Sequence, residues 1–169
     1  AEVCDEIKRR GLKLVWSCNT RADTLDYETM AKMKEAGCRL LVVGYESGNQ
    51  NVLDETRKGI KLEQSEEFAK NTKKLGIKVF GCFMIGLKGD NLETIEDTFR
   101  FAKKLYPDMV FFQQAVPFPG TAFYAWAKEN GYLRTEDYSK WLNPDGYLDC
   151  LVDYPYADHK QIEKIRNNL

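Results

Sequence analysis

Three polar side chains that could bind a ligand directly follow the most apolar short run of the chain. Residues 40–43 (Leu-Leu-Val-Val) are all apolar, show no alternation and are too few for a helix. This pattern predicts a strand that is buried on both faces of a parallel sheet. Glu46, Ser47 and Asn49 come just after it, with Gly48 among them. In α/β folds ligands bind at the carboxyl ends of parallel strands, so this stretch is the first candidate binding site.

Polar residues also follow the three other runs that are expected to form strands, residues 12–18, 77–85 and 109–115. The carboxyl ends of parallel strands converge on one rim. A small ligand at this rim would meet cations, carboxylates and neutral hydrogen-bonding groups together. The polar residues that end or follow these runs are Ser17, Asn19, Arg21, Lys88, Asp90, Gln113 and Gln114.

Most of these residues also have an ordinary structural explanation. Arg21 and Lys88 can be solvated loop cations, and Ser47 can cap the next helix. Gln113 and Gln114 are adjacent, so strand alternation turns one toward the barrel interior and the other toward the helices. We take Gln113 as the inward residue and the binding candidate. Glu46 is harder to explain in this way, because a carboxylate after an apolar strand must be paired or reach solvent.

The chain alternates these strands with amphipathic helices. Asp90 and Glu93 resemble a capping box at the start of one helix, and residues 117–121 (Pro-Phe-Pro-Gly-Thr) predict a rigid loop or a stiff turn before another. Four strand–helix units with short connections require parallel strands and right-handed crossovers. The helices are expected near residues 26–37, 62–75, 90–106 and 121–130.

The regular alternation stops after residue 131. From Tyr132 onward, aromatic residues are scattered among Asn, Asp and Pro until a short charged helix near residues 158–168. We therefore expect an α/β domain over residues 1–131 and an irregular tail over residues 132–169. The tail is expected to pack across the sheet or to reach toward a partner.

Composition limits the classes of function. The 169 residues are 43% apolar and 30% charged with a net charge of −1, which is ordinary for a globular domain. The chain has no basic run that would favour nucleic acid and no apolar stretch long enough to cross a bilayer. Its five cysteines lack a CxxC pair, and one histidine cannot make a metal-binding pair. These features favour reduced thiols in a cytoplasmic protein.

Four segments resemble the later strands of the radical S-adenosylmethionine enzymes. The closest subgroup is the one with an amino-terminal cobalamin-binding domain. The resemblance implies a partial (β/α)6 barrel of the TIM type that contains the third to sixth strands of the family. The segments are residues 15–23, 36–59, 76–99 and 113–124.

The resemblance also implies a role for particular residues. In the family, the strand end that corresponds to Glu46, Ser47, Gly48 and Asn49 contacts the ribose and methionine part of S-adenosylmethionine. Arg21 resembles a position that reaches the carboxylate of this cofactor. The remaining implied contacts are with the adenine, chiefly from Ile85 and its neighbour Gly86, and more weakly from Pro117.

The chain departs from the family pattern at one essential motif. The family holds a four-iron, four-sulfur cluster in a CxxxCxxC loop, and this loop is missing here; Cys4 and Cys18 are too far apart to replace it. We therefore expect the carboxyl-terminal part of a longer enzyme, with the cluster and the upstream half of the barrel elsewhere. The resemblance implies that the parent is a cobalamin-dependent methyltransferase or a related carbon-skeleton enzyme, which acts on a small molecule that the sequence does not identify.

Two properties are expected of such a partial barrel on its own. An unpaired strand edge and an apolar inner face favour self-association. Without the cluster, the chain alone should not cleave S-adenosylmethionine reductively, so no 5′-deoxyadenosine should form.

Two other interpretations remain open from the sequence. The first is a fragment of an aldolase-like barrel that uses Lys88 or Glu46. A Schiff base trapped with borohydride would favour this interpretation. The second is a non-catalytic α/β module whose aromatic tail, residues 132–169, binds a protein partner.

Overall fold

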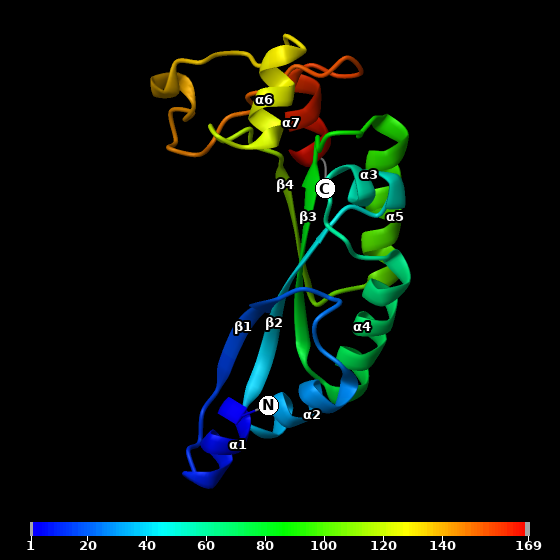
Figure 1. The fold of residues 1–169 in the computed structure, drawn as a ribbon, viewed down its shortest axis with the longest axis vertical. Helices are drawn as coiled ribbons and strands as arrows, with labels where there is room; N and C mark the ends of the chain where they lie inside the picture. The colour runs from blue at the N-terminus through cyan, green and yellow to red at the C-terminus, as the bar shows by residue number, and fades with distance from the viewer. Residues whose placement is uncertain (1, 168–169) are drawn as a thin grey trace.

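The computed structural model describes residues 2–167, and within them four parallel strands form one sheet. The strands are β1 (Trp16–Thr20), β2 (Cys38–Glu46), β3 (Lys78–Ile85) and β4 (Met109–Gln114), and they lie side by side in chain order (Figure 1). The predicted alternation of strands and helices with a parallel sheet is confirmed.

The helices leave one face of the sheet open. In Figure 1, α2, α4 and α5 lie along one face, whereas no helix of the described part of the chain lies along the other. α6 and α7 gather at one end of the sheet and α1 at the opposite end (Figure 1). The helices are α1 (Glu2–Arg9), α2 (Tyr27–Glu35), α3 (Gln50–Glu55), α4 (Leu62–Leu75), α5 (Leu92–Leu105), α6 (Ala122–Glu129) and α7 (His159–Asn167), with a 3₁₀ turn, η1, at Tyr138–Lys140.

The first strand is shorter than expected. It begins at Trp16 rather than at Leu12, and the side chains of Leu12, Leu14 and Val15 are exposed. The neighbouring strand begins only at Cys38, so residues before Trp16 have no described strand to pair with.

The start of α5 also differs from the prediction by one residue. Asn91, not Asp90, caps this helix, because its side-chain oxygen accepts hydrogen bonds from the amides of Glu93 and Thr94. Thr94 completes the capping box by accepting from the Asn91 amide at 2.9 Å. The Asp90 carboxylate is turned back to the preceding loop instead, where it accepts a hydrogen bond from the Gly86 amide.

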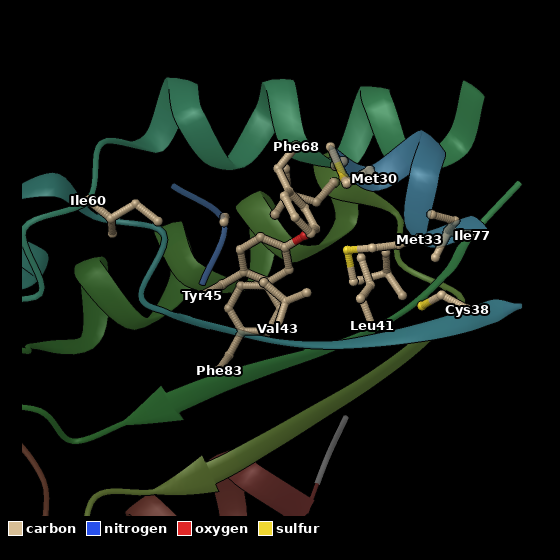
Figure 2. Close-up of a cluster of buried hydrophobic side chains, with 14 of the residues drawn as sticks. Met30, Met33, Cys38, Leu41, Val43, Tyr45, Ile60, Phe68, Ile77 and Phe83 are labelled. Atoms are coloured by element: carbon tan, nitrogen blue, oxygen red, sulfur yellow. The ribbon is translucent and has the colours of Figure 1, made fainter. Parts of the chain in front are cut away.

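The main core lies between the sheet and the helices α2 and α4. Figure 2 shows Met30 and Phe68 of these helices facing Leu41, Val43 and Tyr45 of β2. Alternate residues of β2 point into this core, so helices cover only one face of the strand. The prediction that this strand is buried on both faces is wrong, because the alternate residues on its other face are at most partly buried. The Tyr45 ring also stacks on Phe83 of β3, with 5.3 Å between the ring centroids.

We predict that Tyr45→Phe does not destabilise the protein and raises the free energy of unfolding by up to about 1 kcal/mol. The Tyr45 side chain is 1% exposed, and its hydroxyl has no hydrogen-bond partner among residues 2–167. Removal of this buried hydroxyl therefore removes a desolvation cost and breaks no hydrogen bond. Urea unfolding followed by circular dichroism measures the change. A decrease of more than about 1 kcal/mol would contradict the prediction, because it would mean that the hydroxyl has a partner.

The part of the open face that β3 and β4 form is largely apolar. The register places Phe80 beside Met109, Cys82 beside Phe111 and Met84 beside Gln113 on this face. Met109 and Phe111 are each nearly half exposed, at 46% and 49%. Self-association through this face stays a prediction.

The tail packs against the end of the α/β unit. Val152, Tyr154 and Ile162 form a second buried cluster together with Ile85 of β3 and Ala127 of α6. Because the tail and the end of the sheet share this cluster, residues 132–167 do not have a core of their own in the structure. The predicted boundary at residue 131 stays a prediction. Within the described residues, no helix is both long and apolar enough to cross a membrane.

Candidate functional site

Two ion pairs lie at the ends of β1 and β2, and a hydrogen bond from Arg21 to the main-chain carbonyl of Lys58 joins them. Arg21 donates from Nε and Nη2 to the two carboxylate oxygens of Asp23, at 2.9 and 2.7 Å. Arg21 Nη2 also donates to the carbonyl of Lys58 at 2.8 Å, and Lys58 Nζ donates to Glu46 Oε1 at 2.6 Å. The predicted convergence of Arg21 and Glu46 on one rim is therefore confirmed.

The charges of this cluster, Arg21, Asp23, Glu46 and Lys58, balance. The hydrogen bonds from Arg21 lower the pKa of Asp23, and Asp23 in turn raises the pKa of Arg21. The side chains of Lys58 and Glu46 are only 18% and 23% exposed, so solvent screens this pair less than the surface pairs. A ligand that carries both a carboxylate and an ammonium group could exchange with these pairs without leaving an unpaired charge.

The backbone at Glu46 is unusual. Glu46 has a φ of 65°, in the left-handed region, and the pairing of β2 with β3 shifts register between Gly44 and Glu46. The Glu46 carboxylate folds back over Gly44, because a Cβ atom built on Gly44 would lie 2.6 Å from Glu46 Oε1. A left-handed non-glycine residue costs free energy, and such residues often lie at functional sites.

The three residues after Glu46 are turned toward α5. Ser47 is buried, its hydroxyl lies 3.2 Å from the hydroxyl of Thr98, and the Gly48 amide donates to the same Thr98 oxygen. Asn49 donates to Asp97 at 2.8 Å and caps α3. The suggestion that Ser47 caps the next helix is therefore wrong, because Asn49 does so. The predicted ligand contacts of Ser47, Gly48 and Asn49 stay predictions.

A pocket of about 340 Å³ lies at the ends of β3 and β4. Its apolar lining comes from the open face of the sheet, the two loops that follow these strands, and α6. Its polar lining comes from Glu55, Thr56, Arg57 and Lys88. The sequence did not indicate α6 as part of the site. The apolar lining includes Met84, Leu87, Val116, Phe123 and Trp126.

Ile85 and Gly86 face away from the open side of the sheet. The Ile85 side chain is fully buried in the second cluster. The Gly86 amide donates to Asp90, and its carbonyl accepts a hydrogen bond from the hydroxyl of Tyr154. A contact of Ile85 with an adenine would therefore have to come from its main chain. The predicted contacts of both residues stay predictions.

Asp90 holds the loop after β3. One carboxylate oxygen accepts hydrogen bonds from the amides of Gly86 and Leu87, both at 2.9 Å, and the other accepts from the Thr94 hydroxyl at 2.8 Å. Burial raises the pKa of Asp90, although these three hydrogen bonds oppose the shift. Asp90 was therefore correctly placed at the strand end, but it shapes the loop rather than facing the pocket.

The two glutamines of β4 point to opposite faces, as predicted. Gln113 is exposed on the open face beside Met84, whereas Gln114 is buried and donates to the carbonyl of Leu148 at 3.1 Å. Pro117 is buried in the loop that follows β4. Ligand binding by Gln113 and Pro117 stays a prediction.

The aldolase-like interpretation receives no support from the geometry. A lysine that forms a Schiff base needs an amine that is shielded from solvent. The Lys88 side chain is 46% exposed, and its amine pairs with Glu55 at 3.3 Å. Glu46 is paired with Lys58.

A parallel sheet with helices on one face and polar groups along one rim defines a partial α/β barrel of the TIM type. The family model of the Radical SAM superfamily matches residues 1–102 of the chain. The chain belongs to this superfamily, and the resemblance seen in the sequence is confirmed.

Several curated relatives are named as methyltransferases, and two of them illustrate the similarity. An uncharacterized methyltransferase of Pyrococcus horikoshii is 33% identical over 94% of this chain. The bacteriochlorophyllide d C-8(2)-methyltransferase of Chlorobaculum tepidum is 32% identical over 76% of it. The matched parts make up 34% and 30% of these relatives, so the chain spans about a third of their length.

A solved structure supports the same fold. The radical S-adenosylmethionine methyltransferase TsrM of Kitasatospora setae, with cobalamin and a 4Fe–4S cluster bound, superposes with a TM-score of 0.68 at 21% identity. The match covers 80% of this chain and 29% of TsrM. Within residues 2–167 of the present chain, no group of three or more His, Cys, Asp or Glu side chains could hold a metal ion.

Proposed function

We propose that this chain forms the part of a radical S-adenosylmethionine methyltransferase that binds the organic portion of the cofactor. The observation that carries the proposal is that a charged cluster and an apolar pocket lie on the same rim of the sheet. The balanced cluster of Arg21, Asp23, Glu46 and Lys58 lies at the ends of β1 and β2, and the apolar pocket lies at the ends of β3 and β4.

The two features match the two ends of S-adenosylmethionine. The amino acid end carries a carboxylate and an ammonium group, which suit the cations Arg21 and Lys58 and the carboxylate of Glu46. The adenine is a flat aromatic ring whose faces can stack, and the pocket supplies the aromatic rings of Phe123 and Trp126. A volume of about 340 Å³ is in the range of small-molecule sites.

The proposal assigns the iron–sulfur cluster to a part of a longer enzyme outside these 169 residues. In the proposed enzyme, a four-iron, four-sulfur cluster supplies the electron that cleaves S-adenosylmethionine. All five cysteines of this chain are free and scattered, and the described residues offer no cluster site. The chain spans only about a third of its methyltransferase relatives. This share supports a longer enzyme that also contains the iron–sulfur cluster and the rest of the barrel.

The methyltransferase relatives and the fold shared with TsrM support methyl transfer to an organic small molecule, with cobalamin as the second cofactor. The free thiols support a reducing compartment, and we propose the cytoplasm.

Ligand binding tests this proposal. The full-length enzyme that carries this chain is expected to bind S-adenosylmethionine and S-adenosylhomocysteine saturably in isothermal titration calorimetry. It should bind 5′-methylthioadenosine more weakly, because this analogue lacks the amino acid end. The 169-residue chain alone should form no 5′-deoxyadenosine with dithionite after iron–sulfur reconstitution. Absence of saturable binding to the full-length enzyme would reject the proposal, and 5′-deoxyadenosine from the chain alone would reject the assignment of the cluster to other residues.

A further inference from the structure

The tail contacts the loop after β3 through one tyrosine. The Tyr154 hydroxyl donates to the carbonyl of Gly86, which lies 68 residues earlier in the chain. The contact is tight, because a Cβ atom on Gly86 would lie 2.5 Å from the Tyr154 oxygen. Gly86 has a φ of 80°, which favours glycine at this position.

The same loop is held from its other side by Asp90. The Gly86 amide bonds to Asp90 while the Gly86 carbonyl bonds to Tyr154, so both polar groups of this peptide segment have buried partners. The next two residues, Leu87 and Lys88, line the pocket. The conformation of Gly86 therefore sets where these two lining residues lie.

The tail also packs against α6, which forms another side of the pocket. Phe123 and Trp126 of α6 line the pocket. Ala127 of α6 is buried in the cluster that contains Tyr154, and the Trp126 ring packs against Tyr132 with 5.4 Å between the centroids. Tyr154 itself is not among the lining residues.

We propose that Tyr154 is a positioning residue for the cofactor pocket: its hydrogen bond to Gly86 holds residues 86–90 in the shape that lines the pocket, so that affinity for S-adenosylmethionine depends on the tail. This inference rests on the proposed function of the pocket. Tyr154 acts through Gly86 and touches no ligand.

The chain offers a matched control in Tyr156. Its ring stacks on Tyr154 with 5.2 Å between the centroids. Its hydroxyl is also buried, but has no hydrogen-bond partner within the described residues. Tyr154→Phe and Tyr156→Phe thus remove the same atom from neighbouring stacked rings, and only the first change breaks a hydrogen bond.

Two measurements on the full-length enzyme test the inference. In hydrogen–deuterium exchange without ligand, Tyr154→Phe should speed exchange of the hydrogen-bonded amides of Gly86, Leu87 and Asp90 by about tenfold and leave residues 38–46 of β2 unchanged. In calorimetry, the same variant should raise the Kd for S-adenosylmethionine by about tenfold. Tyr156→Phe should match the unaltered enzyme in both measurements.

The outcomes separate the two proposals. If the unaltered enzyme does not bind S-adenosylmethionine, the proposed function fails, and the exchange rates still show whether Tyr154 holds the loop. If the enzyme binds but Tyr154→Phe leaves the Kd unchanged, the positioning role is wrong, whatever happens to thermal stability. Equal effects of the two substitutions would also overturn it, because the hydrogen bond to Gly86 would then not be the cause.

Discussion

Replacing Gly48 with alanine is expected to lower the free energy of unfolding by about 3 kcal/mol, at the upper end of the usual cost of overpacking. A Cβ atom at this position would lie 2.5 Å from Cβ of Phe101 and 2.7 Å from both the Asp97 carbonyl oxygen and Thr98 Cα. All three atoms belong to the backbone of α5 or are attached directly to it. The helix can move away only by breaking the hydrogen bond between the Gly48 amide and Thr98.

Urea unfolding measures this effect, and Gly11→Ala provides the control. Gly11 has a φ of 65°, but a Cβ atom there would meet nothing within 4 Å. Its substitution should cost about 1 kcal/mol from backbone conformation alone. An effect of Gly48→Ala no larger than that of Gly11→Ala would show that α5 does not pack against this glycine as the structure indicates.

Replacing Lys58 with methionine is expected to raise the Kd for S-adenosylmethionine by about 10- to 100-fold, which corresponds to the loss of one charge-assisted hydrogen bond. Lys58 is the ammonium partner of Glu46, and both side chains are largely shielded from solvent. The substitution removes a cation from the rim and leaves the Glu46 carboxylate without its ion pair. The remaining negative charge would repel the carboxylate of the cofactor.

Two controls make the Lys58 prediction specific. Lys61→Met changes the charge equally, but Lys61 pairs with Asp54 at 3.5 Å with both side chains more than half exposed, so the Kd should not change. Binding of 5′-methylthioadenosine should also be unaffected by Lys58→Met. If Lys58→Met leaves the Kd for S-adenosylmethionine unchanged, or weakens both ligands equally, the charged cluster does not bind the amino acid end.

The sheet and one side of the rim could be predicted from the sequence because their signals are local. Short apolar runs such as residues 40–43 mark strands, although only one face of β2 is covered by helices, and parallel strands bring their ends together wherever the helices lie. Arg21 and Glu46 therefore lie in one charged cluster, as expected. Lys58 was missed because nothing in its local sequence shows that its loop folds back over the end of β2.

The remaining differences come from contacts between residues far apart in the chain. Ser47 and Gly48 were candidates for ligand contact, but Thr98, some 50 residues later, bonds to both. The surroundings of Ile85 and Gly86 depend on a tail whose sequence has no regular period. Spacing rules describe what one helix or strand does, and they contain no information about which distant side chain completes a hydrogen bond.

The order of the strands in space has a consequence for how the chain is made. The strands β1, β2, β3 and β4 lie in the sheet in the order in which they are synthesised. Each new strand can therefore pair with a strand that has already left the ribosome, and no strand needs a later one as its first partner. The loop after β3 is completed much later than its strand, because it acquires its last hydrogen bond only when Tyr154 has emerged. A nascent chain halted shortly before this residue would therefore carry a finished sheet with an unfinished pocket.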